Sequence, residues 1–163
     1  MGMGMGRMAD DPSDIPFWQR IDTRLTTSGR LNEADLDRLA AIGVERVINL
    51  ALVDSPGILA QEDEHVAARG MAYTHIPVPF DAPDEDHYAA FRAAMAQSAA
   101  APVHVHCVRN WRVSAFLYRW HREERGMDEA TARALLERQW TPETSTNPDA
   151  PAWARFIAST PAP

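Results

Sequence analysis

Residues 102–118 read PVHVHCVRNWRVSAFLY, and this stretch decides the fold. Its first part, residues 102–106, alternates valine and histidine, which predicts a short buried strand. A polar turn follows Cys107, and apolar residues then recur at helical spacing over residues 113–125 until Gly126. A strand that passes through a short turn into a helix is the unit of an α/β sheet. In such sheets ligands bind at the carboxyl ends of the strands.

The same alternation of strand and helix patterns runs along most of the chain. Apolar residues at helical spacing, bounded by capping residues or glycines, predict helices over residues 31–42, 58–69, 84–97, 113–125 and 128–140. Alternating or continuous apolar runs predict strands over residues 45–50, 72–79 and 102–106. Pro151 fits the first turn of a last short helix.

This order of elements predicts one α/β domain over residues 15–158. We expect a mostly parallel central sheet of about four to five strands, flanked by helices on both faces. Residues 1–14, which begin with a Met-Gly repeat, are expected to form a disordered leader. Residues 159–163 contain two prolines and are expected to be a frayed tail.

Composition and charge exclude several classes of protein. The 163 residues are 45% hydrophobic and 24% charged, as in ordinary globular domains. The longest apolar stretches, residues 47–53 and 113–120, fall far short of the ~18 residues that span a bilayer, so no membrane contact is expected. A net charge of −7 disfavours binding to nucleic acid. The single cysteine, Cys107, allows no intrachain disulfide and fits the reducing cytoplasm.

Cys107 is placed where an α/β protein can use a reactive thiol. The turn after it leads into a helix, so several backbone N–H groups and the positive end of the helix dipole converge on one point. A thiol at this point is expected to be largely thiolate near neutral pH. Arg109 and Arg112 add positive charge, and a guanidinium holds an oxyanion through two hydrogen bonds. The segment is therefore suited to binding an anion beside a nucleophile, although a cysteine at a strand end is also commonly a small buried hydrophobe.

This segment resembles the active-site signature of the cysteine-dependent protein tyrosine and dual-specificity phosphatases. In that signature His-Cys is followed by five residues, an arginine, and then a serine or threonine. The corresponding residues here are Val105, His106, Cys107, Arg112 and Ser114. A closer similarity is to a bacterial subgroup of phosphatase-like proteins, near the domain called beta-lactamase-hydrolase-like. Residues 25–31 (LTTSGRL), 47–50 (VINL) and 75–78 (HIPV) resemble pieces of that subgroup in the same order, so the resemblance covers residues 24–125.

The resemblance implies a phosphatase-like hydrolase that cleaves a phosphate monoester through a phosphocysteine intermediate. The substrate would be a phosphotyrosine or phosphoserine protein or a small phosphate ester, and the loop would hold inorganic phosphate or another oxyanion. Cys107 would be the nucleophile, Arg112 would bind phosphate, and Ser114 would hydrogen-bond the sulfur. His106 would orient the loop, and the substrate would contact His106, Val108, Arg109, Asn110 and Trp111, with Trp111 stacking on an aromatic ring. This chemistry needs no cofactor and no metal ion.

Phosphatases of this kind also use a general acid, usually an aspartate on a loop upstream of the cysteine. Asp81 is the candidate, because it follows the predicted strand over residues 72–79 and lies between two prolines. Asp84 and Asp86 are alternatives, although acidic residues are also favoured in the first turn of a helix.

Two departures from the signature keep other functions open. Only four residues, not five, separate Cys107 from Arg112. Either the loop is one residue shorter, as in the sulfurtransferases called rhodaneses, or Arg112 enters the site from a different angle. The alternatives are therefore a rhodanese-like enzyme that carries a Cys107 persulfide and a catalytically silent anion-binding module. Asn110 stands where phosphatases often have glycine, and asparagine tolerates the left-handed backbone of such a turn.

The sequence gives little support for metal or nucleotide chemistry. His104 and His106 share one face of a predicted strand and His75 lies on another, but no carboxylate spacing completes a metal site. No glycine-rich phosphate loop opens a helix.

Overall fold

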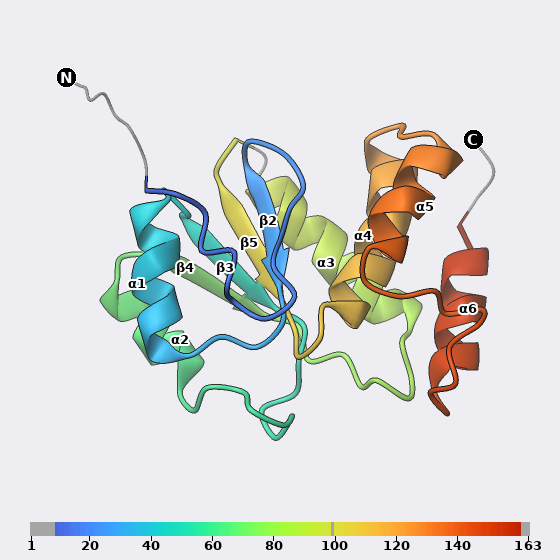
Figure 1. The fold of residues 1–163 in the computed structure, drawn as a ribbon, viewed down its shortest axis with the longest axis horizontal. Coiled ribbons are helices and arrows are strands. Elements are labelled where there is room, and N and C mark those ends of the chain that lie inside the picture. The colour runs from blue at the N-terminus through green and yellow to red at the C-terminus, as the bar shows by residue number, and fades with distance from the viewer. Residues whose placement is uncertain (1–8, 99, 161–163) are drawn as a thin grey trace.

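The computed structural model describes residues 9–98 and 100–160 and folds them around a five-stranded sheet (Figure 1). The strands are β1 (Gln19–Arg20), β2 (Leu25–Ser28), β3 (Arg46–Asn49), β4 (Ala72–His75) and β5 (Val103–His106). Their order across the sheet is β1-β2-β5-β3-β4. The pairs from β2 to β4 are parallel, while β1 pairs antiparallel with β2. β5 is therefore the central strand, with β2 and β3 on its two sides.

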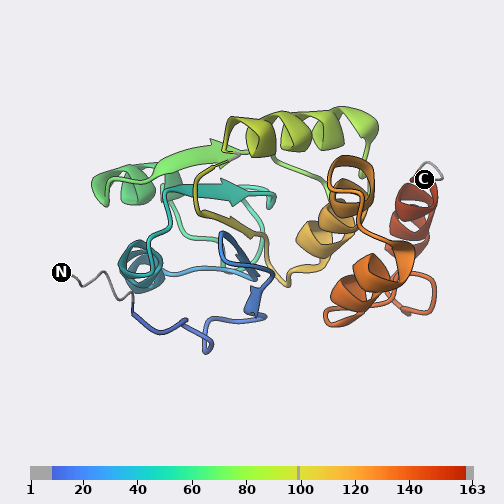
Figure 2. The ribbon, with the colours of Figure 1, turned by 90° about the horizontal axis from the view of Figure 1, so that it is seen from above.

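Helices connect the strands and cover the sheet. They are α1 (Glu33–Ala41), α2 (Glu62–Ala68), α3 (Glu85–Gln97), α4 (Trp111–Glu124), α5 (Glu129–Glu137) and α6 (Ala150–Ala158). Both ribbon views show α4, α5 and α6 gathered at one end of the molecule, with α1 and α2 at the other (Figures 1 and 2). Within residues 9–98 and 100–160, no helix is long and apolar enough to cross a membrane.

Alternation of side chains along the strands divides the core into two. Val103 and Val105 of β5 and Ile48 of β3 belong to the larger core, which α3, α4 and α6 complete. Val47 of β3 belongs to the smaller core, with residues of α1 and α2. His104 alternates with the valines of β5 and therefore faces the side of α1 and α2.

The expected fold class is confirmed, and the sheet is mostly parallel as predicted. Several elements are shorter than predicted, and for β4 and α2 the sequence gives local reasons. β4 ends at His75 because Pro77, two residues on, cannot donate to a strand ladder. α2 begins only at Glu62 because Gln61 before it has a left-handed φ of 55°.

The sequence patterns do not predict β1 and β2. β2 is buried along its whole length, yet Thr26, Thr27 and Ser28 are polar, so it carries no apolar signal. Their hydroxyl groups hydrogen-bond within the sheet: Thr26 and Ser28 contact the two ring nitrogens of His104, each at 2.8 Å. Partners from a distant strand therefore make this polar strand stable in the interior.

The ordered domain starts upstream of the expected boundary at residue 15. Pro12 is buried, and Asp11 pairs with Arg20 at 2.6 Å. This pair lowers the pKa of Asp11, chiefly through the hydrogen bond from Arg20. Residues 9–14 of the expected leader are thus described in contact with the domain, while residues 1–8 lie outside the described residues.

The last described residues also stay attached to the domain. The Ser159 hydroxyl donates to Arg155 O at 3.0 Å, and the Thr160 hydroxyl donates to Ile157 O at 2.6 Å. Residues 161–163 of the expected tail lie outside the described residues.

Candidate active site

Cys107 follows β5 directly, at the carboxyl end of the central strand. Its side chain is buried, and its backbone N–H donates to Ser28 O at 3.4 Å, which continues the pairing with β2. On the other side, the Leu50 N–H donates to His106 O at 2.9 Å and extends the pairing with β3. Neighbouring strands on both sides therefore fix the thiol at the edge of the sheet where α/β proteins bind ligands.

Asn110 closes the turn between Cys107 and α4. Its φ of 66° is left-handed, which an asparagine tolerates better than most residues. Its fully buried side chain donates through Nδ2 to Phe17 O and to Thr27 Oγ1, both at 2.9 Å. Its Oδ1 accepts from Ser114 Oγ at 3.1 Å. One side chain therefore ties the loop to the segment before β1, to β2 and to α4.

The backbone N–H groups and the carbonyl groups of the loop differ in their hydrogen-bond partners. Among the described residues, none accepts a hydrogen bond from the backbone N–H groups of residues 108–113. The Val108 carbonyl, in contrast, accepts from the Arg30 N–H at 3.0 Å. The backbone at position 29 lies so close to the Val108 carbonyl that only glycine fits there, because a Cβ on Gly29 would lie 2.3 Å from Val108 O.

Arg112 lies beside this loop, in the first turn of α4. Its side chain is 7% exposed, and its Nη1 donates to Val78 O at 2.8 Å. Its guanidinium lies 5.7 Å from the centre of the Phe80 ring. Arg109 is exposed instead, with its guanidinium 5.4 Å from the centre of the Trp111 ring. Packing therefore fixes Arg112, while Arg109 lies at the solvent side.

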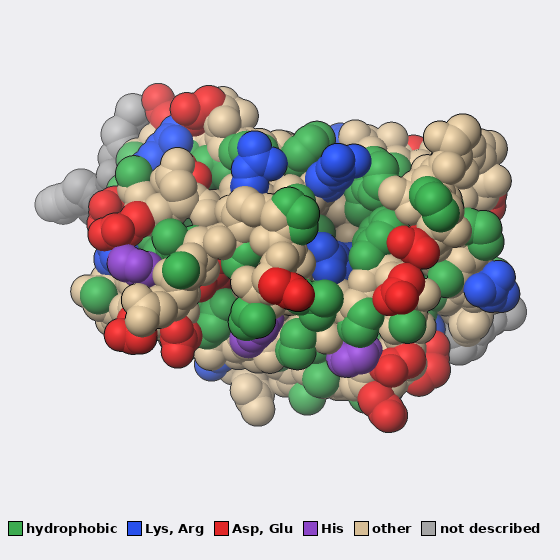
Figure 3. All heavy atoms as spheres, turned by 90° about the horizontal axis from the view of Figure 1, so that it is seen from below, with side chains coloured by type: hydrophobic (Ala, Val, Ile, Leu, Met, Phe, Trp, Pro, Cys, Tyr) green, Lys and Arg blue, Asp and Glu red, His purple; other side chains and the backbone are tan. Residues whose placement is uncertain are grey.

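A cavity of about 530 Å³ surrounds the thiol. Its lining comes from the loop and from four other segments of the chain: Arg30, Pro56, Gly57, Phe80, Cys107, Val108, Arg109, Trp111, Arg112 and Asn147. Arginines line it, and none of these lining side chains is a carboxylate. Figure 3 shows this face, where basic side chains gather beside hydrophobic ones. In a chain with a net charge of −7, the cavity is a local basic site that suits an anion.

Aromatic rings form one wall of the cavity. The rings of Trp111 and Trp140 stack with centroids 4.7 Å apart, and Trp140 Nε1 donates to Trp111 O at 3.1 Å. Phe80 lies 6.0 Å from Trp111, and its carbonyl accepts from Trp153 Nε1 at 2.7 Å. Trp140 covers one face of Trp111, which fixes this ring in the cavity wall.

Ser114 does not form the hydrogen bond to the Cys107 sulfur that the sequence analysis expects. A hydroxyl has one proton to donate, and the proton of Ser114 goes to Asn110 Oδ1. Ser114 is also absent from the cavity lining. In this structure its contribution is to hold the loop residue Asn110.

Asp81, the expected general acid, does not line the cavity. It lines a separate hollow of about 380 Å³, together with Asp84, Glu85 and Arg155. Asp84 accepts from the His87 N–H at 2.8 Å and caps α3, which is the helix-start role that competes with catalysis. Asp86, the other alternative, lies in the first turn of the same helix. The structure therefore brings Cys107 and Arg112 together but keeps these aspartates apart from them.

The three histidines weighed as metal ligands are engaged in other contacts. His75 Nε2 contacts Ala51 O at 2.6 Å, and both nitrogens of His104 contact hydroxyl groups of β2. Burial, and then the neighbouring His106, hold the pKa of His104 well below its ordinary value. Among the described residues, no group of three or more His, Cys, Asp or Glu side chains is arranged to hold a metal ion.

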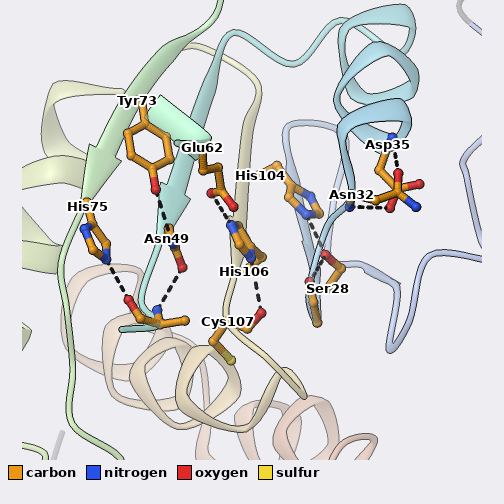
Figure 4. A network of polar contacts seen from close by, with 12 residues as sticks. Ser28, Asn32, Asp35, Asn49, Glu62, Tyr73, His75, His104, His106 and Cys107 are labelled. Atoms are coloured by element: carbon orange, nitrogen blue, oxygen red, sulfur yellow. Dashed lines mark hydrogen bonds and ion pairs between the residues drawn. The ribbon is translucent and has the colours of Figure 1, made fainter. Parts of the chain in front are cut away.

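His106 is fully buried and has a carboxylate partner that the sequence analysis did not identify. Its Nε2 lies 2.6 Å from Glu62 Oε2, and its Nδ1 lies 3.2 Å from Cys107 O (Figure 4). Glu62 stands in the first turn of α2, where an acidic residue is ordinary, so its position gives no signal. The same holds for Arg30 and Phe80 in the cavity, since only the fold brings these segments to the thiol.

Comparisons with known proteins agree with this geometry. Residues 18–120 match the family model described as "Beta-lactamase hydrolase-like protein, phosphatase-like domain". No curated protein matches the chain. Among solved structures, the DUF442 protein of Shewanella putrefaciens CN-32 is 30% identical, with a TM-score of 0.74. The match covers 91% of this chain and 90% of that one.

More distant solved structures share the fold. TpbA of P. aeruginosa, solved in complex with pTyr, is 17% identical with a TM-score of 0.69, over 94% of this chain and 88% of its own. Human DUSP28 is 22% identical with a TM-score of 0.59, over 87% of this chain and 94% of its own. The family match spans the whole sheet, the loop and most of α4. The chain therefore belongs to the family of the phosphatase-like domain of beta-lactamase hydrolase-like proteins.

Proposed function

We propose that the protein hydrolyses phosphate monoesters, with Cys107 as the nucleophile. The arrangement around the thiol is the observation that supports this most. The N–H groups of residues 108–113 have no acceptor among the described residues, Arg112 is buried beside them, and no carboxylate lines the cavity. Such a site suits the non-bridging oxygens of a phosphoryl group next to the sulfur. The phosphatase-like family of the chain supports the same activity.

The proposed reaction has two displacement steps. The Cys107 thiolate attacks phosphorus, so that a P–S bond forms and the bond from phosphorus to the ester oxygen breaks, and the departing oxygen takes up a proton. Water then attacks the phosphocysteine, the P–S bond breaks, and inorganic phosphate and the thiolate are released. Arg112 and the loop N–H groups stabilise the charge on the transferred group in both steps.

An aromatic phosphate is the substrate class that the cavity favours. Phe80 and Trp111 give it an apolar wall, and its volume of about 530 Å³ leaves room for a ring beyond the phosphate. A phenol also leaves more readily than an alkyl alcohol, which matters because no carboxylate lines the cavity. We therefore propose phosphotyrosine in a protein or a small aryl phosphate as substrate. Hydrolysis of phosphoserine, whose leaving group is an alkyl alcohol, would in contrast require a general acid.

Asp81 is proposed as that acid. It lies outside the cavity, but Phe80, its neighbour in sequence, lines it. A rearrangement of the turn around these two residues would bring the carboxyl to the leaving oxygen. Dual specificity, with phosphoserine as well as phosphotyrosine as substrate, requires this movement.

A cytoplasmic location accompanies this proposal. The nucleophile has to remain a free thiol, and Cys107 is the single cysteine of the chain. A reducing compartment keeps such a thiol active. The partners proposed are a phosphorylated protein or a phosphate ester, without nucleic acid or membrane.

Turnover of p-nitrophenyl phosphate by the purified protein tests the function. The wild type and Arg138→Gln, an exposed arginine outside the cavity, are expected to be active, and Cys107→Ser is expected to be inactive. Activity that persists in Cys107→Ser would contradict the mechanism.

The short spacing from Cys107 to Arg112 favours one second candidate, a rhodanese-like sulfurtransferase. There the thiolate would attack the outer sulfur of thiosulfate, sulfite would leave, and cyanide would take the outer sulfur from the persulfide as thiocyanate. Thiocyanate formation without phosphatase activity would move the assignment to this enzyme. Binding of vanadate without either activity would identify a silent anion-binding module.

A further inference from the structure

Glu62 is a buried carboxylate to which the proposed mechanism gives no part. Its side chain is almost inaccessible to solvent, at 3% exposure, and it lies between α2 and β5 (Figure 4). Removal of a carboxylate from water is costly unless close partners replace the lost hydration. Its Oε2 lies 2.6 Å from His106 Nε2, whereas its Oε1 has no hydrogen-bond partner in the structure. The contact with His106 is therefore the main compensation that this residue has.

The partners of His106 determine where its ring carries hydrogen. Its Nδ1 lies 3.2 Å from Cys107 O, and a carbonyl oxygen only accepts, so Nδ1 must hold a hydrogen for this bond. One further proton lies between Nε2 and Glu62 Oε2, on the ring or on the carboxyl group. In both cases Nδ1 carries a hydrogen, and the short contact with Glu62 fixes the ring so that the Nδ1–H points at the carbonyl of Cys107.

Polar groups of β3 and β4 lie near Glu62 and contact one another. Asn49 Nδ2 donates to Tyr73 Oη at 3.1 Å, and Asn49 Oδ1 accepts from the Ala51 N–H at 2.8 Å (Figure 4). Burial, and then the negative charge of Glu62, raise the pKa of the Tyr73 phenol. The phenol therefore stays protonated near the carboxylate.

The orientation of one peptide group connects this network to the anion site. The carbonyl of Cys107 and the N–H of Val108 belong to the same trans peptide, so they point in opposite directions. A bond from His106 holds the carbonyl, which turns the Val108 N–H to the other side. The next carbonyl, that of Val108, is held by the Arg30 N–H in the same way. Two successive peptide groups of the loop are thus fixed by their carbonyl oxygens, which leaves their N–H groups for a ligand.

We propose that Glu62 is a positioning residue for the anion site: through His106 it fixes the Cys107–Val108 peptide, so that the Val108 N–H points at an oxyanion above the thiol. The inference rests on the proposed function in that it needs an oxyanion at Cys107. Glu62 itself touches neither the substrate nor the sulfur.

Two substitutions separate the hydrogen bond of Glu62 from its other properties. In Glu62→Gln the amide N–H can donate to His106 Nε2, so the Nδ1–H is retained, and vanadate affinity is expected to stay within roughly threefold of the wild type. In Glu62→Leu the partner is lost, and vanadate affinity is expected to fall roughly tenfold or more, because a hydrogen bond to the anion is misdirected. Glu64→Gln, an exposed glutamate of the same helix, is the matched control and should change nothing.

The ring nitrogens of His106 provide a readout that a merely structural role would not move. ¹⁵N NMR should show a hydrogen on Nδ1 in the wild type, and Nε2 hydrogen-bonded to the partner at position 62 in the wild type and in Glu62→Gln. In Glu62→Leu, Nε2 should instead show the shift of a bare nitrogen without a hydrogen-bond partner. A wild type without a hydrogen on Nδ1 would overturn the inference, and this measurement needs no variant to fold. A folded Glu62→Leu protein that binds vanadate as tightly as the wild type would overturn it as well. If only the proposed function is wrong, the protein should bind vanadate tightly without hydrolysing esters, and the Glu62 variants should still change vanadate affinity.

Discussion

The turn after β4 contributes residues to two hollows whose lining side chains carry charges that are mostly of opposite sign. Phe80 lines the cavity around Cys107, where the charged lining residues are arginines. Asp81, the next residue, lines a second hollow whose charged residues are mostly acidic: Asp81, Asp84, Glu85 and Arg155. The proposed nucleophile and the proposed acid are therefore neighbours across one turn, but they do not share a site.

The difference follows from the elements that carry the two groups. Cys107 directly follows the central strand, Arg112 stands in the first turn of α4, and contacts to β2 and Val78 fix them. Asp81 stands in a turn, outside regular structure. Groups on strands and helices are held more precisely than groups on turns. In the proposed mechanism the groups for anion binding and nucleophilic attack are thus preassembled, whereas protonation of the leaving group depends on the turn.

The largest effect is expected from Asp81→Asn on a poor leaving group. If Asp81 reaches the cavity during turnover, hydrolysis of an alkyl phosphate should fall on the order of 100-fold, because the departing alkoxide needs a proton. Hydrolysis of p-nitrophenyl phosphate should change little, because its leaving group is stable as the anion. Steady-state rates on both esters measure this, with Asp84→Asn as the comparison. A loss confined to Asp84→Asn would move the assignment there, and equal losses on both esters would mean that Asp81 has a structural role.

A somewhat smaller effect is expected from Arg112→Lys. An ammonium cannot replace the two parallel hydrogen bonds of a guanidinium, so vanadate should bind roughly 30-fold more weakly. Arg109→Lys should cost much less, because Arg109 is exposed and Arg112 is buried in the cavity wall. Titration calorimetry with vanadate gives both affinities. An exchange of the two effects would show that Arg109, and not Arg112, supplies the main charge.

Gly29→Ala tests the backbone of the cavity without touching a charge. The added Cβ would lie 2.3 Å from Val108 O, so the loop has to move and its N–H groups lose their alignment. Vanadate affinity should fall about tenfold, as expected when a charge-assisted hydrogen bond is lost. The melting temperature, measured on the same sample, separates this effect from unfolding. Unchanged affinity in a folded variant would show that the close approach of Gly29 to the loop is not needed.

The smallest effect on vanadate affinity is expected from His121→Gln, because His121 lines neither of the two hollows. Burial lowers the pKa of His121 to about 4. Because the unfolded chain takes up this proton near pH 6.5, the free energy of unfolding should fall as the pH drops from 7 to 5, by about 2 kcal/mol from this group. Urea unfolding at the two pH values should show a smaller fall in His121→Gln, with unchanged vanadate affinity at pH 7. Equal falls in both proteins would mean that His121 is not held neutral.

Features of the fold that depend on neighbouring residues in the chain, such as strands, helices, caps and turns, can be predicted from the sequence. The strand before Cys107 and the helix after it have clear periods, and Asn32 forms the capping box of α1 with Asp35. The left-handed turn at Asn110 also follows from the residue type. These features place Cys107 and Arg112 at the carboxyl end of a central strand.

What the sequence does not predict depends on contacts between distant segments. β2 is polar, and as a buried strand it depends on hydrogen-bond partners from distant segments: the ring nitrogens of His104 contact Thr26 and Ser28, and Asn110 donates to Thr27. Glu62 lies 44 residues before His106, and no local signal pairs them. The place of Asp81 depends on the path of a turn, which two flanking prolines restrict but do not determine.

The reactivity of Cys107 tests the central claim, that the loop binds an oxyanion beside a thiolate, most directly. As the single cysteine, it can be followed by mass spectrometry during alkylation with iodoacetate at pH 6. We expect alkylation to be faster than that of a free model thiol, because the cavity stabilises the thiolate and attracts the anionic reagent. Vanadate or phosphate should slow it by occupying the same place. Alkylation no faster than that of the model thiol, and unaffected by vanadate, would contradict the account.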